Sequence, residues 1–474
     1  MPFLFNQKWS FNSMKQLLAH GLRRSLCLLC AASLMFPSLT LTASAQGKVV
    51  LVRDAEAEQL LRDYAKPIFK AAGLQNASPE IILVNDKSFN AFVPDSSRMF
   101  INIGVILESE TPNEVIGVIA HETGHIAGRH LVRLRSAASN AQIISVIGMI
   151  LGAGAVAAGA VTGSSDVTGG GAAAALGSGA IGQRSFLSYR RGEEAAADRA
   201  ALKYLAATRQ SAAGMLKTFE RFAEQQVFSA RFTDPYAQSH PMARDRYVSL
   251  ATAAQQSKYF NQKDSASLQH RHDMVRAKLY AFTNHPNSVA KAYPRSDKSM
   301  PAQYARAIAA MQSRARGAQK AIDDLIRQQP NNPNFYELKG QALIESGKPK
   351  AAIAPFRKAV SINPNEGQYL IWLGYALVSS NDAGALPEAK SVLKKGLQRD
   401  PNSNIGYSQL AIAHARLGET PQADLTTAQG LLIRGDLQAA KRYATRAQKN
   451  LKRGSPAWLQ ADDIVSYKEP NLGR

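Results

Sequence analysis

The sequence predicts a mainly helical protein, with an α+β domain that contains a small β-sheet, followed by an α-solenoid. Helical periodicity runs through 55–72 and again through 115–132. Two short runs of β-type residues, 81–84 and 98–102, lie between these stretches. In the last third of the chain, a pattern of small and large residues returns at a fixed interval, which indicates stacked helix pairs. The 474 residues are enough for two or three domains.

Residues 1–45 have the layout of a cleavable secretory signal. They hold four basic residues and no acidic one, and an apolar run from 26 to 41 leads to Ala43-Ser44-Ala45. Met14 is an alternative start, which would give a signal of more usual length. We therefore expect an exported protein in a bacterial periplasm, with association to a membrane left open.

Cysteine content and charge restrict the chemistry further. Cys27 and Cys30 both lie in the signal, so the mature chain has no disulfide and no thiolate ligand for zinc. The net charge is +21; without the four basic residues of the signal, 53 basic against 36 acidic residues leave +17. No basic stripe with stacking aromatic residues is present, so nucleic-acid binding is not expected. An anionic membrane surface or acidic proteins remain possible partners.

Residues 121–125 read His-Glu-Thr-Gly-His, an H-E-x-x-H pattern within the second predicted helix. Two histidines four residues apart project from one helix face, so one zinc ion can bind both, and Glu122 can reach a water at the metal. Thr111 and Glu114 form a capping-box pattern that starts this helix. The run 98–102 precedes it, and we expect its open edge to pair with an extended substrate.

A catalytic zinc site needs three protein ligands and a water, so a third ligand must lie farther along the chain. His130 follows His121 by nine residues, which places it on the opposite face unless the helix breaks. A longer form of the pattern has a third histidine at position 131, but Leu131 stands there.

Glu194 is the better third ligand, because it lies in an alanine-rich stretch, 191–198, that favours a helix. Asp198 shares its face and can accept a hydrogen bond from a zinc-bound imidazole. Glu193 is the alternative register, which would leave Asp198 on the wrong face.

The 121–125 pattern and the stretch 191–198, Arg-Gly-Glu-Glu-Ala-Ala-Ala-Asp, resemble the two signatures of the M48 family of zinc metallopeptidases. Asn90-Ala91-Phe92 and Ser239-His240-Pro241, followed by Arg244 and Arg246, also match the family pattern. The resemblance implies a zincin-type helical metallopeptidase domain with a small edge β-sheet.

The resemblance also assigns roles to residues. It implies one zinc ion per chain, bound by His121, His125 and Glu194, with Glu122 as the catalytic base. It further implies that His240 can occupy the open position of the metal and hold the enzyme latent. Arg246 or its neighbour Arg244 is a candidate for stabilising the oxyanion, but either could instead hold a carboxylate such as that of Asp198.

The repeat in the last third is of the tetratricopeptide type, since Pro330 and Pro364 are 34 residues apart. Further units follow, the last of them degenerate, and 301–329 resembles a leading unit. Such arrays bind peptides or partner proteins on their concave face. We therefore divide the mature chain into a peptidase domain at 46–255, connecting helices at 256–300 and repeats at 301–474.

Residues 136–182 form an apolar, Gly/Ala-rich insertion within the peptidase domain. The stretch from 143 to 161 is nearly all apolar and long enough to span a bilayer. We expect a hairpin that dips into a membrane or contacts substrates. A buried or disordered insertion and a transmembrane helix are the alternatives.

These features predict an exported zinc-dependent endopeptidase. The resemblance implies misfolded or stalled outer-membrane proteins as substrates. It also implies repeats that dock these clients or the outer-membrane β-barrel assembly machinery. The alternative is a chaperone or adaptor of outer-membrane protein assembly that acts mainly through the repeats, with a latent zinc site.

Overall fold

The computed structural model describes residues 50–130, 133, 191–228, 240 and 244–468. The predicted signal at 1–45 and the predicted insertion at 136–182 lie outside the described residues. Within the described part of the chain, no helix combines the length and the apolar character needed to cross a bilayer.

The first part of the described chain contains a four-stranded sheet in the order β1-β2-β4-β3. Its strands are β1 (Leu51–Val52), β2 (Glu80–Val84), β3 (Ala91–Phe92) and β4 (Arg98–Asn102). Strands β2 and β4 run parallel, and the other two pairs are antiparallel. The strands predicted at 81–84 and 98–102 are therefore confirmed.

The expectation that 98–102 presents an open edge is wrong. Strand β3 pairs with β4 along that edge, with Ala91 opposite Ile101 and Phe92 opposite Phe100. The rings of Phe92 and Phe100 stack with their centroids 5.1 Å apart, which reinforces the pairing. The short strand β3 therefore forms the edge of the sheet on this side.

Helices α2 (Ala55–Ala71), α3 (Ile103–Glu108), α4 (Pro112–Ala127), α7 (Ala213–Phe228) and α9 (Arg244–Gln255), with helical residues 191–207, complete this part. Helix α4 begins with the predicted capping box, in which the backbone N–H of Thr111 donates to the Glu114 carboxylate at 3.2 Å. It ends at Ala127, five residues before the predicted end at 132, because Gly128 caps it and Arg129 takes a positive φ of 51°.

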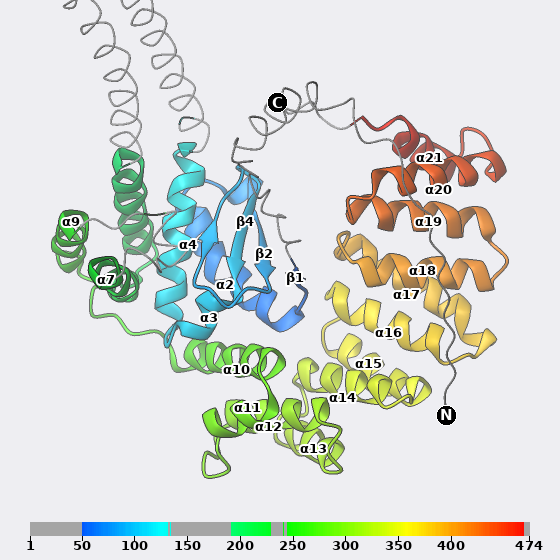
Figure 1. The fold of residues 1–474 in the computed structure, drawn as a ribbon, viewed down its shortest axis with the longest axis horizontal. Helices are drawn as coiled ribbons and strands as arrows, with labels where there is room; N and C mark the ends of the chain where they lie inside the picture. The colour runs from blue at the N-terminus through cyan, green and yellow to red at the C-terminus, as the bar shows by residue number, and fades with distance from the viewer. Residues whose placement is uncertain (1–49, 131–132, 134–190, 229–239, 241–243, 469–474) are drawn as a thin grey trace, which may run out of the picture. The chain divides into compact units, whose positions relative to one another are not determined.

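Helix α4 lies at the centre of the first hydrophobic core, between the sheet and α7 (Figure 1). Val115, Val118 and Ile119 are fully buried there. Gly117 faces α7 so closely that a Cβ atom on it would lie 2.6 Å from the Cβ atom of Met215. This close packing fixes α4 as a rigid support for the residues at 121–125.

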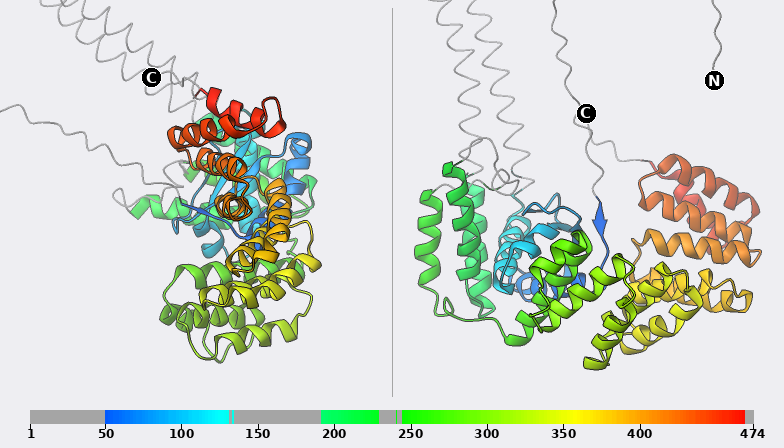
Figure 2. Two further views of the ribbon diagram at one scale, coloured as in Figure 1. Left: turned by 90° about the vertical axis from the view of Figure 1, so that its right-hand side faces the viewer. Right: turned by 60° about the horizontal axis from the view of Figure 1, so that its bottom comes forward.

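The second part is a series of helix pairs that stack side by side (Figures 1 and 2), which confirms the predicted repeats. The repeats are formed by α12 (Met300–Gln312), α13 (Ala318–Gln328), α14 (Pro333–Glu345), α15 (Pro349–Ile362), α16 (Gly367–Ser379), α17 (Leu386–Arg399), α18 (Asn404–Arg416), α19 (Thr420–Ile433), α20 (Leu437–Asn450) and α21 (Pro456–Ser466). Gly340 in α14 and Gly374 in α16 leave room for Phe356 and Leu393 of the paired helices.

Helices α10 (Ala266–Thr283) and α11 (Pro286–Ala292) connect the two parts. Lys278 of α10 is 3% exposed, and its Nζ lies 2.6 Å from Asp54, 3.3 Å from Glu56 and 3.8 Å from Glu337. Burial lowers the pKa of Lys278, but the surrounding carboxylates outweigh it and hold the pKa well above its ordinary value. One buried cation therefore joins α2 and α14 through α10.

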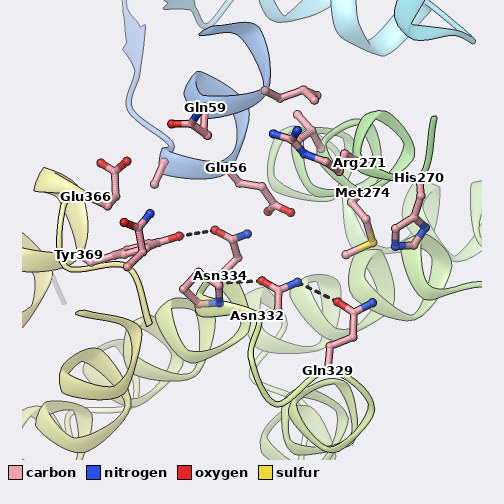
Figure 3. Close-up of a pocket in the computed structure, with 15 residues that line it drawn as sticks. Glu56, Gln59, His270, Arg271, Met274, Gln329, Asn332, Asn334, Glu366 and Tyr369 are labelled. Atoms are coloured by element: carbon pink, nitrogen blue, oxygen red, sulfur yellow. Dashed lines mark hydrogen bonds between the residues drawn. The ribbon is translucent and has the colours of Figure 1, made fainter. Parts of the chain in front are cut away.

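A cavity of about 280 Å³ lies beside this ion-pair network, between α2, α10 and the first repeats (Figure 3). Polar side chains line much of it. Tyr369 donates to Asn334 at 2.5 Å, and Asn332 donates to Gln329 at 3.0 Å. None of its lining residues belongs to the 121–125 or 191–198 segments.

Candidate metal centre

His121 and His125 bring their Nε2 atoms to within 3.1 Å of each other on one face of α4. The four-residue spacing of the helix produces this arrangement, as predicted. His121 is fully buried and His125 is 9% exposed, so both imidazoles are shielded from solvent. Their remaining nitrogens, the two Nδ1 atoms, point to other partners.

Glu194, on the helical residues 191–207, completes a triangle with the two histidines. Its carboxylate oxygens lie 3.4 Å from Nε2 of His121 and 3.5 Å from Nε2 of His125. Gly124 permits this approach, because a Cβ atom there would lie 2.9 Å from the backbone oxygen of Ala197. The structure thus brings together the three residues predicted as metal ligands.

His240 supplies a fourth donor atom beside His121, His125 and Glu194. Its Nδ1 lies 3.3 Å from Nε2 of His121 and 3.1 Å from Oε2 of Glu194. Its Nε2 lies 3.4 Å from Oε1 of Glu122. The donor atoms of His121, His125, Glu194 and His240 all lie within 4.8 Å of one another.

The spacing of these donors fits a small tetrahedral cation. Ligand atoms about 2.0–2.2 Å from a tetrahedral zinc ion lie roughly 3.3–3.6 Å from one another. The Nε2 atoms of His121 and His125 are 3.1 Å apart, and the two carboxylate oxygens of Glu194 lie 3.4 Å from the first and 3.5 Å from the second, respectively. Imidazole nitrogen together with carboxylate oxygen is also a donor set that zinc accepts.

Glu122 is fully buried beside the donors, and neither of its carboxylate oxygens has a hydrogen-bond partner among the described residues. Burial raises the pKa of Glu122 above its ordinary value. Nε2 of His240 approaches Oε1 without making a hydrogen bond, and a buried carboxylate without hydrogen bonds is costly unless a water or a ligand group meets it. Its place next to the donors therefore suits a residue that handles the proton of a water at the metal.

Asp198 lies on the same helix face as Glu194, as predicted, and its Oδ1 is 3.0 Å from Nδ1 of His121. Arg246 contacts both carboxylates: Nη2 donates to Oδ1 of Asp198 at 2.8 Å, and Nη1 lies 3.1 Å from Oε2 of Glu194. Burial raises the pKa of Asp198, but hydrogen bonds with Arg246 and His121 outweigh it and lower the pKa. These contacts are those expected of the second predicted role of Arg246, holding a carboxylate, and its part in catalysis stays a prediction.

The pKa values of the two helix histidines shift in opposite directions. Burial lowers the pKa of His121, but Asp198 and Glu194 outweigh it and raise the pKa to about 9. Burial, helped by the charge of His121, lowers the pKa of His125 well below its ordinary value. Binding of a cation at Nε2 of His121 would therefore release a proton.

His130 is not one of the four donors, but the predicted reason for excluding it is wrong. Because α4 ends at Ala127, His130 does not lie on the opposite helix face; its ring folds back toward α4. Its Nδ1 lies 3.0 Å from Nδ1 of His125. Gly128, a recognisable helix terminator, was the signal in the sequence that could have placed it.

Comparison with known families agrees with this geometry. Residues 53–254 match the model of peptidase family M48, and residues 333–366 match a tetratricopeptide repeat. The chain carries an M48 metallopeptidase domain. It is 23% identical to the beta-barrel assembly-enhancing protease of Escherichia coli K12 over 423 residues, which cover 86% of this chain and 82% of that protein. The protein of the same name from Yersinia pestis is 24% identical over 383 residues, which cover 79% and 75% of the two chains.

Solved structures of tetratricopeptide proteins are also similar in part. The crystal structure of MamA is 19% identical, covers 33% of this chain and 89% of that chain, and gives a TM-score of 0.26. YrrB, described as a tetratricopeptide protein with an unusual peptide-binding site, is 18% identical, covers 37% and 91%, and gives a TM-score of 0.30.

Proposed function

We propose that this metallopeptidase is an exported, zinc-dependent endopeptidase that hydrolyses misfolded or stalled outer-membrane proteins. Four nitrogen and oxygen donors within 4.8 Å of one another, next to the buried Glu122, support the zinc site most directly. The names of the relatives support the link to outer-membrane assembly. The repeats are proposed to dock the clients or the β-barrel assembly machinery, in the periplasm.

In this proposal His121, His125 and Glu194 hold one zinc ion. When bound, zinc would supply a Lewis acid that polarises the scissile carbonyl. Glu122 takes the proton from the attacking water and delivers it to the leaving amine, a role that its raised pKa favours. Asp198 orients the imidazole of His121, and Arg246 keeps Asp198 and Glu194 in place.

His240 is proposed to hold the enzyme latent. A catalytic zinc site keeps its fourth position for water or substrate. Nδ1 of His240 lies 3.1 Å from Glu194 and 3.3 Å from His121, which is close enough for it to serve as a fourth ligand in this proposal. The imidazole would have to leave before a peptide could enter.

The same observation favours a second function. A chain whose metal position is filled by His240 could act mainly as a chaperone or adaptor of outer-membrane assembly through its repeats. Residues 136–182 lie outside the described residues. Their contact with a membrane stays part of the proposal for either function.

The test measures two quantities for the wild type, Glu122→Gln and His240→Ala. These are the zinc content of each protein and the rate at which it degrades a misfolded outer-membrane barrel protein. We expect Glu122→Gln to keep zinc and lose degradation, and His240→Ala to degrade faster. His270→Ala, which removes an exposed histidine of α10, is the control. Equal degradation by the wild type and Glu122→Gln would refute the peptidase, and an unchanged rate in His240→Ala would refute the latency.

A further inference from the structure

The two helix histidines both direct Nε2 toward the donor cluster, so each has its Nδ1 left for an outer partner. For His121 that partner is the carboxylate of Asp198, at 3.0 Å. For His125 the partner among the described residues is not a carboxylate but Nδ1 of His130, at 3.0 Å. Ligand histidines are commonly fixed by an acceptor at their second nitrogen, and His130 stands where that acceptor is needed.

His130 is itself tied to a carboxylate. Its Nε2 lies 3.0 Å from Oε2 of Glu193. Glu193 is held in turn by Arg133, whose Nε and Nη2 donate to its two oxygens at 3.1 and 2.7 Å. His130 is 5% exposed, so this contact is shielded from water. A continuous chain of polar contacts therefore runs from His125 through His130 and Glu193 to Arg133.

We propose that His130 and Glu193 are positioning residues for the metal ligand His125. The inference rests on the proposed function, in which His125 binds zinc. It assigns to Glu193 a role distinct from that of the neighbouring Glu194, because Glu194 faces the donor cluster and Glu193 faces His130.

Proton placement along the chain supports the assignment. A carboxylate can only accept a hydrogen bond, so the hydrogen of a neutral His130 lies on Nε2, toward Glu193. Nδ1 of His130 then carries a lone pair and can accept from Nδ1–H of His125. That arrangement leaves the lone pair of Nε2 in His125 directed at the donor cluster, which is the tautomer a metal ligand needs.

The end of α4 builds this arrangement. Arg129 takes a positive φ of 51° directly after Gly128, which turns the chain so that the ring of His130 returns to the helix. A Cβ atom on Gly128 would lie 2.1 Å from Nε2 of His130, so only glycine leaves room for the ring in this position. Helix α4 ends three residues before His130, and this end allows the His130 ring to lie beside His125.

The test measures the zinc dissociation constant of the full chain by competition with a chromophoric chelator. The variants are His130→Phe, which fills the space without an acceptor, and His130→Gln, whose amide oxygen can accept from His125. We expect His130→Phe to bind zinc about 10–100-fold more weakly than the wild type, and His130→Gln to recover most of the loss. His414→Phe is the matched control, because it removes a histidine that contacts a carboxylate, Glu419, in the repeats.

Wild-type affinity in His130→Phe would overturn the inference, and so would equal losses in the Phe and Gln variants, which would indicate packing alone. A wild type that binds no zinc would refute the proposed metal site and this inference with it. Nitrogen NMR of histidine in the zinc-loaded wild type gives a readout that needs no variant. We expect the hydrogen of His130 on Nε2, facing Glu193, and a hydrogen on Nδ1 of His130 would overturn the assignment, because that nitrogen could then not accept from His125.

Discussion

The backbone oxygen of Ala197 lies 2.9 Å from the place that a Cβ atom on Gly124 would occupy. A contact that short forces either α4 or the helix formed by residues 191–207 to move. Ala197 lies on the second of these helices, three residues after Glu194. We therefore expect Gly124→Ala to destabilise the fold by about 1–3 kcal/mol and to weaken zinc binding, because Glu194 shifts away from His125. Urea denaturation and chelator competition measure the two effects.

Gly192→Ala is the matched control for this prediction. Gly192 lies on the same helix as Glu194, and a Cβ atom added to it would meet no heavy atom within 4 Å. Its substitution should leave zinc affinity unchanged and stabilise the fold by about 0.5–1 kcal/mol. Wild-type zinc affinity in Gly124→Ala would show that the two helices can separate without moving Glu194.

Arg246 contacts the carboxylates of both Asp198 and Glu194. We expect Arg246→Leu to weaken zinc binding by about 10–100-fold, because the proposed ligand Glu194 and Asp198, which contacts the ligand His121, lose their common partner. Arg246→Lys should recover only part of the loss, since an ammonium cannot reproduce the two-pronged contact. Arg271→Leu, which removes a partly exposed arginine of α10, should have no effect. Normal zinc affinity with lost hydrolysis would instead assign Arg246 to the oxyanion.

Lys278 is the buried cation among Asp54, Glu56 and Glu337. Lys278→Met should lower the free energy of unfolding by about 3–5 kcal/mol, because it leaves buried carboxylates without their counter-ion. Lys320→Met is the control: Lys320 is exposed and pairs with Asp324 at 3.1 Å, so its loss should cost about 0–1 kcal/mol. Similar urea midpoints for the two variants would contradict a structural role for Lys278.

His272 is fully buried on α10, with Nε2 2.9 Å from the backbone oxygen of Ser109 and Nδ1 3.2 Å from the hydroxyl of Tyr64. Burial lowers the pKa of His272 below its ordinary value. The unfolded chain therefore takes up a proton below about pH 6.5 that the folded chain does not. This contribution to stability is complete above that pH and is lost as the pH falls toward the folded pKa.

We expect His272→Phe to reduce the difference between the urea midpoints measured at about pH 7.5 and about pH 5.5. His270→Phe, on the same helix but exposed, should keep the difference of the wild type. An unchanged difference in His272→Phe would assign the acid sensitivity to other groups.

Residues close in sequence gave the most accurate predictions. The four-residue spacings of His121 with His125 and of Glu194 with Asp198 define helix faces, and the structure keeps both. The capping box at Thr111 also predicted the start of α4, because its hydrogen bonds lie within one helical turn. These are local relationships that no distant contact overrides.

Tertiary contacts decided what the sequence could not predict. The apolar pattern of α4 continues to 132, but the helix ends at Ala127, where Gly128 makes room for His130. From the sequence we predict an open edge at β4, yet β3 pairs with it. The sequence leaves two roles open for Arg246, and only the structure shows its contacts with Asp198 and Glu194. The boundaries drawn at 255 and 300 stay predictions.

Helix α10 contributes side chains to two hydrophobic cores. Val275 and Leu279 belong to the core around α4, whereas Met274 and Ala281 belong to the core of the first repeats. A helix shared in this way makes unfolding cooperative, because opening either core removes support from the other. The peptidase domain and the first repeats should therefore melt in a single calorimetric transition, and cleavage of the chain within α10 should destabilise both at once.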